Sequence, residues 1–203
     1  MLRVWLILVA AVLFAHPLPA SAYVDGGPME TTKKVLESSN RIVTGEGDRD
    51  AKLVSLKELL RDFLDTDALG RQSMGKNLEG RTPEQQARFF DLFRDLFVRT
   101  YVQRLLLFDA PDFAFVEEEI DGDRAHIGTQ IVTPRDRFAV DYDFEKTAEG
   151  WKATDIFIED VSLSANFQAQ FSKALSKTSF DELMDRLERK LHGKKKKGAA
   201  GGT

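Results

Sequence analysis

The chain has 203 residues, of which 42% are hydrophobic and 31% are charged, with a formal net charge of −4. This balance is typical of a single globular domain, not of a disordered or membrane-spanning chain. The absence of cysteine excludes disulfides, thiolate metal sites and cysteine nucleophiles, and three histidines are too few for a multi-histidine metal centre.

Residues 1–22 have the features of an export signal. Arg3 precedes an apolar run from Val4 to Ala15, and Ala20-Ser21-Ala22 has the small-x-small pattern that signal peptidase cleaves. The run is shorter than the roughly 20 apolar residues that span a bilayer, so an uncleaved anchor is the weaker alternative. We expect a cleaved signal peptide, a mature chain that begins near Tyr23, and a periplasmic location.

The mature chain is acidic except at its C-terminus. All 33 Asp and Glu lie between Tyr23 and Arg189, whereas six of the 29 Lys and Arg lie outside this span. This excess of negative charge argues against a nucleic-acid partner, because phosphate must be neutralised by basic side chains. Residues 192–203 are predicted to be a disordered basic tail, which either solubilises the chain or contacts anionic lipid head groups.

Four helical segments precede any strand. Apolar residues at helical spacing predict helices over 28–44, 50–64 and 65–78. A longer helix over 82–108 begins with Thr82-Pro83-Glu84-Gln85, which is a capping box with proline at the first helical position. This helix carries an aromatic stripe made of Phe90, Phe93, Phe97 and Tyr101.

From Asp112 the apolar period changes to two, which indicates β-strands. Turn signals at Asp121-Gly122, Pro134-Arg135-Asp136 and Ala148-Glu149-Gly150 separate them. The predicted strands run from 112 to the first turn and over 124–133, 137–144 and 151–159. Two helices follow, over 162–176 and 179–191, and the second begins with another capping box, Ser179-Phe180-Asp181-Glu182.

This order of elements predicts one α+β domain over residues 23–191. The short connections imply a curved four-stranded antiparallel sheet packed by several helices, with one apolar face that curls over the long aromatic helix. The 15 phenylalanines fit either a filled core or an enclosed pocket for an apolar ligand. Periodicity does not distinguish these two possibilities.

Few residues offer catalytic chemistry. Asp155 interrupts the apolar fourth strand and is either a desolvated general base or a structural carboxylate, which holds nearby backbone N–H groups or pairs with an Arg. His126 lies in the middle of a strand, and Ser162 and Ser164 lack a nucleophile context. The sequence predicts no cofactor and no metal. An NTF2-like enzyme acting on a small apolar substrate, with Asp155 or His126 as base, is the alternative function.

The segment from Gly150 to Phe171 resembles the signature of the MlaC/toluene-tolerance family. The matching residues are Gly150-Trp151-Lys152, Asp155, Val161-Ser162, Asn166 and Gln170-Phe171. A second block agrees, from Thr82 through Phe89 and Phe93 to Arg99-Thr100-Tyr101, and the resemblance covers about residues 30–190. The chain departs from the family pattern at three positions, with Asp160 in place of Gly, Phe167 in place of Tyr and Gln168 in place of Arg. Loss of this Arg removes a donor fork for phosphate, which favours a less phosphate-dependent cargo.

The resemblance implies a periplasmic lipid carrier that is auxiliary to an ABC transporter. Members of the family hold acyl tails in an NTF2-like lipid-binding cavity between a curved sheet and helices. They ferry phospholipid between an outer-membrane lipoprotein complex and an inner-membrane ABC transporter with an MCE-domain protein. A related branch accompanies hopanoid synthesis, so the ligand expected here is a phospholipid or a hopanoid.

Eight residues are predicted to bind the lipid. Correspondence of position with the family gives Tyr101, Phe138 and Val161. Periodicity adds Phe93, Phe97, Val140, Tyr142 and Phe167. The main hypothesis is therefore a monomeric, non-enzymatic lipid carrier, and a periplasmic adaptor with a filled core is a third.

Overall fold

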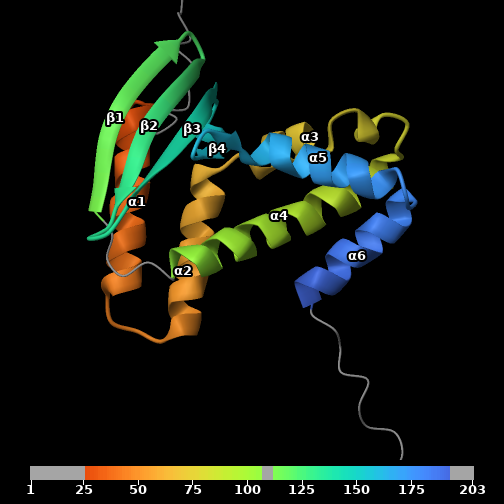
Figure 1. Cartoon of the computed structure of the whole chain (residues 1–203), viewed down its shortest axis with the longest axis horizontal. Helices are drawn as coiled ribbons and strands as arrows, with labels where there is room; N and C mark the ends of the chain where they lie inside the picture. The colour runs from red at the N-terminus through yellow and green to blue at the C-terminus, as the bar shows by residue number, and fades with distance from the viewer. Residues whose placement is uncertain (1–25, 107–111, 193–203) are drawn as a thin grey trace, which may run out of the picture.

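A computed structural model of the chain describes residues 26–106 and 112–192, which form six α-helices, one 3-10 helix and five strands (Figure 1). The predicted signal peptide, the predicted end of the long helix at Phe108 and residues 193–203 lie outside this part. The helices are α1 (Pro28–Thr44), α2 (Arg49–Phe63), α3 (Thr66–Met74), η1 (Gly75–Leu78), α4 (Pro83–Leu105), α5 (Leu163–Leu175) and α6 (Phe180–His192). The strands are β1 (Asp112–Asp121), β2 (Arg124–Val132), β3 (Arg137–Thr147), β4 (Gly150–Ile158) and β5 (Val161–Ser162).

The helices begin where the local sequence satisfies their first backbone N–H groups. Thr82 and Gln85 exchange backbone-to-side-chain hydrogen bonds of 3.2 and 3.3 Å at the start of α4. Ser179 and Glu182 make the same exchange, at 3.2 and 3.0 Å, before α6. Both predicted capping boxes are confirmed. Helix α6 continues to His192, one residue into the segment predicted as tail.

The five strands form one antiparallel sheet in the order β1-β2-β3-β4-β5. The predicted meander is confirmed, but the prediction of four strands missed β5. This strand has two residues, too few for an alternating pattern, and pairs with β4 across a tight turn. Glu159 and Asp160 form that turn with φ of 50° and 62°, a left-handed backbone that non-glycine residues seldom adopt. Asp160 stands where the family pattern has Gly, the residue best suited to such a backbone.

The sheet bends because its ladders contain irregularities. In the β1–β2 ladder the extra residue is Val116 of β1, between Phe115 and Glu117. In the β3–β4 ladder it is Thr154 of β4, opposite Asp143 and Phe144. Such bulges add local twist and turn a strand away from its partner. Figure 1 shows the resulting arch of β1, β2 and β3 beside α1 and α2.

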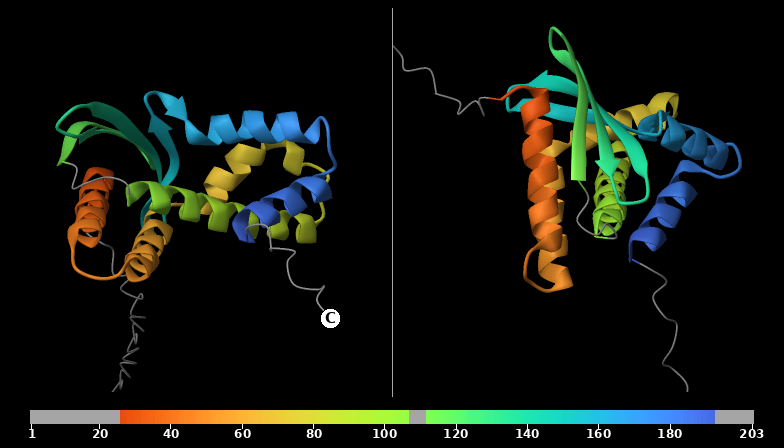
Figure 2. Two further views of the ribbon diagram at one scale, coloured as in Figure 1. Left: turned by 60° about the horizontal axis from the view of Figure 1, so that its bottom comes forward. Right: turned by 60° about the vertical axis from the view of Figure 1, so that its left-hand side comes forward.

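Helices α1 and α2 lie side by side against the inner face of this arch, and α4 lies farther along with α5 and α6 (Figure 2). The Phe63 ring of α2 packs edge-on against Tyr142 and Phe144 of β3, each with ring centroids 5.5 Å apart. The sequence predicted a sheet that curls over the long aromatic helix. In the structure α1 and α2 also lie against the sheet, and the main contacts of α4 are with α2, α3 and α6.

Within residues 26–106 and 112–192, no helix combines the length and the apolar character needed to cross a membrane.

Candidate functional site

An apolar cavity lies between the sheet and helices α1, α2 and α4. Its volume is about 350 Å³, and we call it the sheet cavity. Apolar and aromatic side chains form almost all of its wall, including Val35, Leu36, Leu60, Phe63, Val140 and Ile156. Among the described residues that line it, Ser39 from α1 is the only one without an apolar or aromatic side chain. The cavity is within the range of about 300–1,000 Å³ that small-molecule sites occupy.

A second cavity, of about 440 Å³, lies between α4, α5, α6 and the β4–β5 turn, and we call it the helix cavity. Aromatic side chains form one part of its wall, and Thr100, Asn166, Gln170 and Lys190 form another. Three residues, Phe97, Tyr101 and Ile158, line both cavities. The two cavities are therefore neighbours that share one wall.

All eight residues predicted to bind lipid line these cavities. Phe97, Tyr101, Phe138, Val140 and Tyr142 line the sheet cavity. Phe93, Val161 and Phe167 line the helix cavity together with Phe97 and Tyr101. The structure thus distributes the predicted set over two adjoining cavities instead of one.

The sequence reasoning missed the contribution of α1 and α2 to the sheet cavity. Val35, Leu36, Leu60 and Phe63 line it and belong to the apolar stripes of these two helices. Such stripes were visible in the sequence, but a stripe that faces a cavity is identical to one that faces a filled core.

Phe97 and Tyr101 of the shared wall belong to a row of aromatic rings on α4. Phe97 packs against Tyr101 with ring centroids 4.5 Å apart and against Phe93 at 5.7 Å. Phe167 of α5 meets Phe93 edge-on at 5.6 Å. Spacing of four residues along α4 places these rings on one face of the helix. They form a continuous apolar surface that runs from one cavity into the other.

Two predicted site residues remain accessible to solvent. Phe138 of β3 is 38% exposed and Val161 of β5 is 54% exposed, although both side chains line cavities. Large apolar side chains in contact with both solvent and a cavity are typical of the rim of a binding pocket. Phe138 marks the rim of the sheet cavity, and Val161 marks that of the helix cavity.

Tyr142 is the ionisable group buried most deeply in the sheet cavity. Burial, with a smaller contribution from the Asp141 carboxylate, raises the pKa of the Tyr142 hydroxyl above its ordinary value. The phenol therefore stays neutral at physiological pH, and the ring adds no charge to the cavity.

Asp155 is a structural acceptor. Its side chain is 5% exposed, and its carboxylate accepts hydrogen bonds from Ser162 Oγ at 2.6 Å and Ser164 Oγ at 2.6 Å. It also accepts from the backbone N–H groups of Ile156 at 2.8 Å and Ser164 at 3.1 Å. The interpretation of Asp155 as a carboxylate that holds backbone N–H groups is confirmed. Four donors occupy its two oxygens, which leaves little capacity for a general base.

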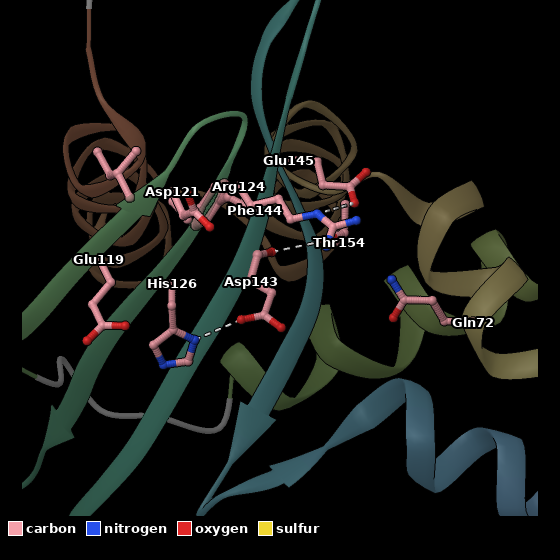
Figure 3. A pocket seen from close by; sticks show the side chains of 11 residues that line it. Gln72, Glu119, Asp121, Arg124, His126, Asp143, Phe144, Glu145 and Thr154 are labelled. Atoms are coloured by element: carbon pink, nitrogen blue, oxygen red, sulfur yellow. Dashed lines mark hydrogen bonds and ion pairs between the residues drawn. The ribbon is translucent and has the colours of Figure 1, made fainter.

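His126 lies on the outer face of the sheet, away from both cavities. Its Nδ1 is 2.8 Å from Asp143 Oδ1, in an open polar hollow with Glu119, Arg124 and Glu145 (Figure 3). In the part of the chain that the structure describes, no three His, Asp or Glu side chains gather in a way that could hold a metal ion. The hollow is open and charged, which is poorly matched to an apolar substrate.

Comparison with known proteins identifies the family of this chain and a solved structure with the same fold. Residues 29–189 match the family described as MlaC protein. The chain belongs to the MlaC family. The resemblance in the segment from Gly150 to Phe171 is therefore confirmed. A solved structure of a phospholipid-binding protein from Ralstonia solanacearum, in complex with a phospholipid, has the same α+β fold with a TM-score of 0.73. The two chains are 24% identical, and the match covers 82% of this chain and 98% of that one.

Gln168, where the MlaC family pattern has Arg, lies outside both cavities. Its side chain lies over Gly75 of η1, so close that a side chain on Gly75 would meet Gln168 Nε2 at 2.3 Å. Gln168 is not among the lining residues of the sheet cavity or the helix cavity. Gln168 is therefore not placed to contact a head group in either cavity.

Proposed function

We propose that this member of the MlaC family is a periplasmic carrier that holds the acyl tails of a phospholipid in the sheet cavity and the helix cavity. The observation that carries the proposal is the sheet cavity, a space of about 350 Å³ with an almost entirely apolar wall. Protein interiors are close-packed and rarely leave such a space without a ligand to fill it.

Acyl tails fit this wall chemically. Each buried CH₂ group contributes about 0.8 kcal/mol, so two long chains bind tightly without a charged clamp on the head group. The Ralstonia solanacearum protein of the same fold was solved with a phospholipid, which supports a phospholipid as cargo. A hopanoid is the other apolar cargo that this wall would accept.

A carrier of this kind works by exchange with partners. We propose that the protein, as a monomer, shuttles lipid between an outer-membrane lipoprotein complex and an inner-membrane ABC transporter with an MCE-domain protein. Release requires a partner that opens the cavities or offers an apolar path, because the enclosed tails would otherwise have to enter water. The export signal predicted in residues 1–22 supports a periplasmic location.

The experiment starts from mature Tyr23–Thr203, purified from a bacterial periplasm and examined by native mass spectrometry and lipid extraction. We expect a bound mass that extraction identifies as phospholipid. Phe138→Glu and Val161→Asp should each reduce loading, because each places a carboxylate in the wall of one cavity. Val54→Asp is the matched control, since Val54 is 55% exposed and lines neither cavity.

Other outcomes would contradict the proposal. A wild-type protein that stays free of lipid after incubation with phospholipid vesicles would favour an adaptor with a filled core. Turnover of a small apolar substrate that disappears in Asp155→Asn or His126→Gln would favour the NTF2-like enzyme. Undiminished loading in both cavity variants would show that the lipid lies elsewhere.

A further inference from the structure

The helix cavity has a polar part that its role as a container for acyl tails does not explain. Thr100 of α4, Asn166 and Gln170 of α5, and Lys190 of α6 line it together with its aromatic side chains. Gln170 Nε2 donates to Asn166 Oδ1 at 3.2 Å, so this acceptor of Asn166 is already engaged. The hydroxyl of Thr100 and the amide N–H groups of Asn166 are donors, as is the Lys190 ammonium.

Helix α6 is held so that Lys190 stays beside this cavity. Arg88 of α4 donates to Asp185 Oδ1 at 2.7 Å and to Glu188 Oε2 at 2.9 Å. Arg99, also of α4, donates to the carbonyl of Leu191 at the end of α6. Spacing of three residues places Leu187 and Lys190 on one face of α6, and both line the cavity.

The charge of Lys190 is not used by the fold. Among the described residues, the Lys190 ammonium has no ion-pair or hydrogen-bond partner. The acidic residues of α6 nearest to it, Asp185 and Glu188, pair with Arg88 instead. Arg189 and His192 share the last turn of α6, yet neither lines the helix cavity. An unpaired ammonium beside a cavity with further donors is suited to a phosphate, for which lysine acts as a point charge.

We propose that Lys190 binds the phosphate of a glycerophospholipid whose acyl tails occupy the cavities. This inference rests on the proposed lipid-carrier function and adds the position of the head group, at the α6 end of the helix cavity. The cargo is then a lipid with a phosphate, and an uncharged lipid with the same tails binds less well.

In the test, delipidated protein is incubated with vesicles that contain equal amounts of dioleoylphosphatidylglycerol and dioleoylglycerol. These two lipids differ only in the phosphoglycerol group. Native mass spectrometry gives the ratio of the two bound lipids. Wild type should prefer the phospholipid, and Lys190→Gln should lower the ratio about fivefold, the upper range for an exposed ion pair. Lys190→Arg should restore the ratio, and Lys177→Gln, an exposed lysine of neither cavity, should leave it unchanged.

Salt gives a readout that a purely structural role of Lys190 would not produce. At about 1 M salt the screening length falls to about 3 Å, so the wild-type preference should decrease while that of Lys190→Gln stays constant. An equal ratio in wild type and Lys190→Gln would overturn the inference while leaving the carrier function intact. Uptake of neither lipid by wild type would instead contradict the carrier function.

A last arm distinguishes a lipid head group from free phosphate. Inorganic phosphate alone is titrated into wild type and Lys190→Gln and followed by phosphorus NMR. We expect no saturable binding, because the tails supply most of the affinity. Saturable binding that Lys190→Gln abolishes would identify a free-anion site and overturn the assignment to a lipid head group.

Discussion

The carboxylate of Asp155 determines where β4 ends and α5 begins. Ser162 and Ser164 donate to it from the two sides of this junction, and Ser162 Oγ in turn accepts from Ala165 N at 3.0 Å. One buried side chain thus joins the last strand pair to the first turn of α5. Val161, on the rim of the helix cavity, is adjacent to this junction, so Asp155 also positions that rim.

Substitution of Asp155 should therefore destabilise the fold. We expect Asp155→Ala to lower the free energy of unfolding by about 3 kcal/mol, because it leaves the buried donors of Ser164 and the partly buried hydroxyl of Ser162 without their acceptor. Urea unfolding, followed by the fluorescence of Trp151, measures the change. Asp62→Ala, at an exposed position of α2, should change stability by less than about 0.5 kcal/mol. An equal effect of the two substitutions would contradict this account.

Interactions at its two ends fix the position of helix α6. Ser179 and Glu182 satisfy the first N–H groups, and Arg99 of α4 contacts the carbonyl of Leu191 at the other end. Arg81 lies over the ring of Phe180, 4.7 Å from its centroid, and adds a contact to the start of the helix. These local interactions hold the α6 wall of the helix cavity in place.

Loss of the N-cap should weaken α6 measurably. We expect Ser179→Ala to lower the free energy of unfolding by about 1 kcal/mol, because the N–H of Glu182 loses its acceptor. Ser55→Ala is the control, since Ser55 is an exposed position inside α2, where Ala is the better helix former and stability should rise slightly. Urea titrations of both variants give the two changes. A neutral Ser179→Ala would show that packing on α4 alone holds α6.

Elements with local signals could be predicted from the sequence, whereas those that depend on distant partners could not. The capping boxes at Thr82 and Ser179 involve atoms within four residues, so the sequence identifies them directly. Strand β5 exists because β4 and the Asp155 carboxylate hold Val161 and Ser162, which no local pattern reveals.

The same limit applies to the candidate site. Alternation placed Val140 and Tyr142 on the apolar face of the sheet, and their burial confirms it. The hollow they face arises from the distance between α1, α2 and the arch of the sheet. That distance depends on how the whole molecule packs. The sequence pattern of an apolar stripe is the same whether the space that the stripe faces is filled or empty.

At the scale of the whole molecule, cavities within the core lower stability until a ligand fills them. We expect lipid-loaded protein to unfold at a higher temperature than delipidated protein, because a ligand that binds only the folded state stabilises it. The gain is about 2.7 kcal/mol when the free ligand reaches a hundred times its Kd. Differential scanning calorimetry of both forms measures it.

Variants make this prediction specific to the cavities. Phe138→Glu should remove the difference between the two preparations, because Phe138 lines the sheet cavity, and Val54→Asp should retain it. Equal unfolding temperatures of loaded and delipidated wild type would show that the lipid binds the surface and leaves the core unchanged.

The bulge in β1 has a consequence for how the protein behaves in a crowded compartment. In the described part of the chain, β1 lies at one edge of the sheet, where its outer backbone groups could template a strand from a second copy. The register shift between Phe115 and Glu117 twists this edge, and Glu118 accepts from Met29 N at 3.0 Å, which ties the edge to α1. Three successive glutamates, 117–119, would also face their like in a second copy. The β1 edge is therefore poorly suited to pair with a strand of a second copy.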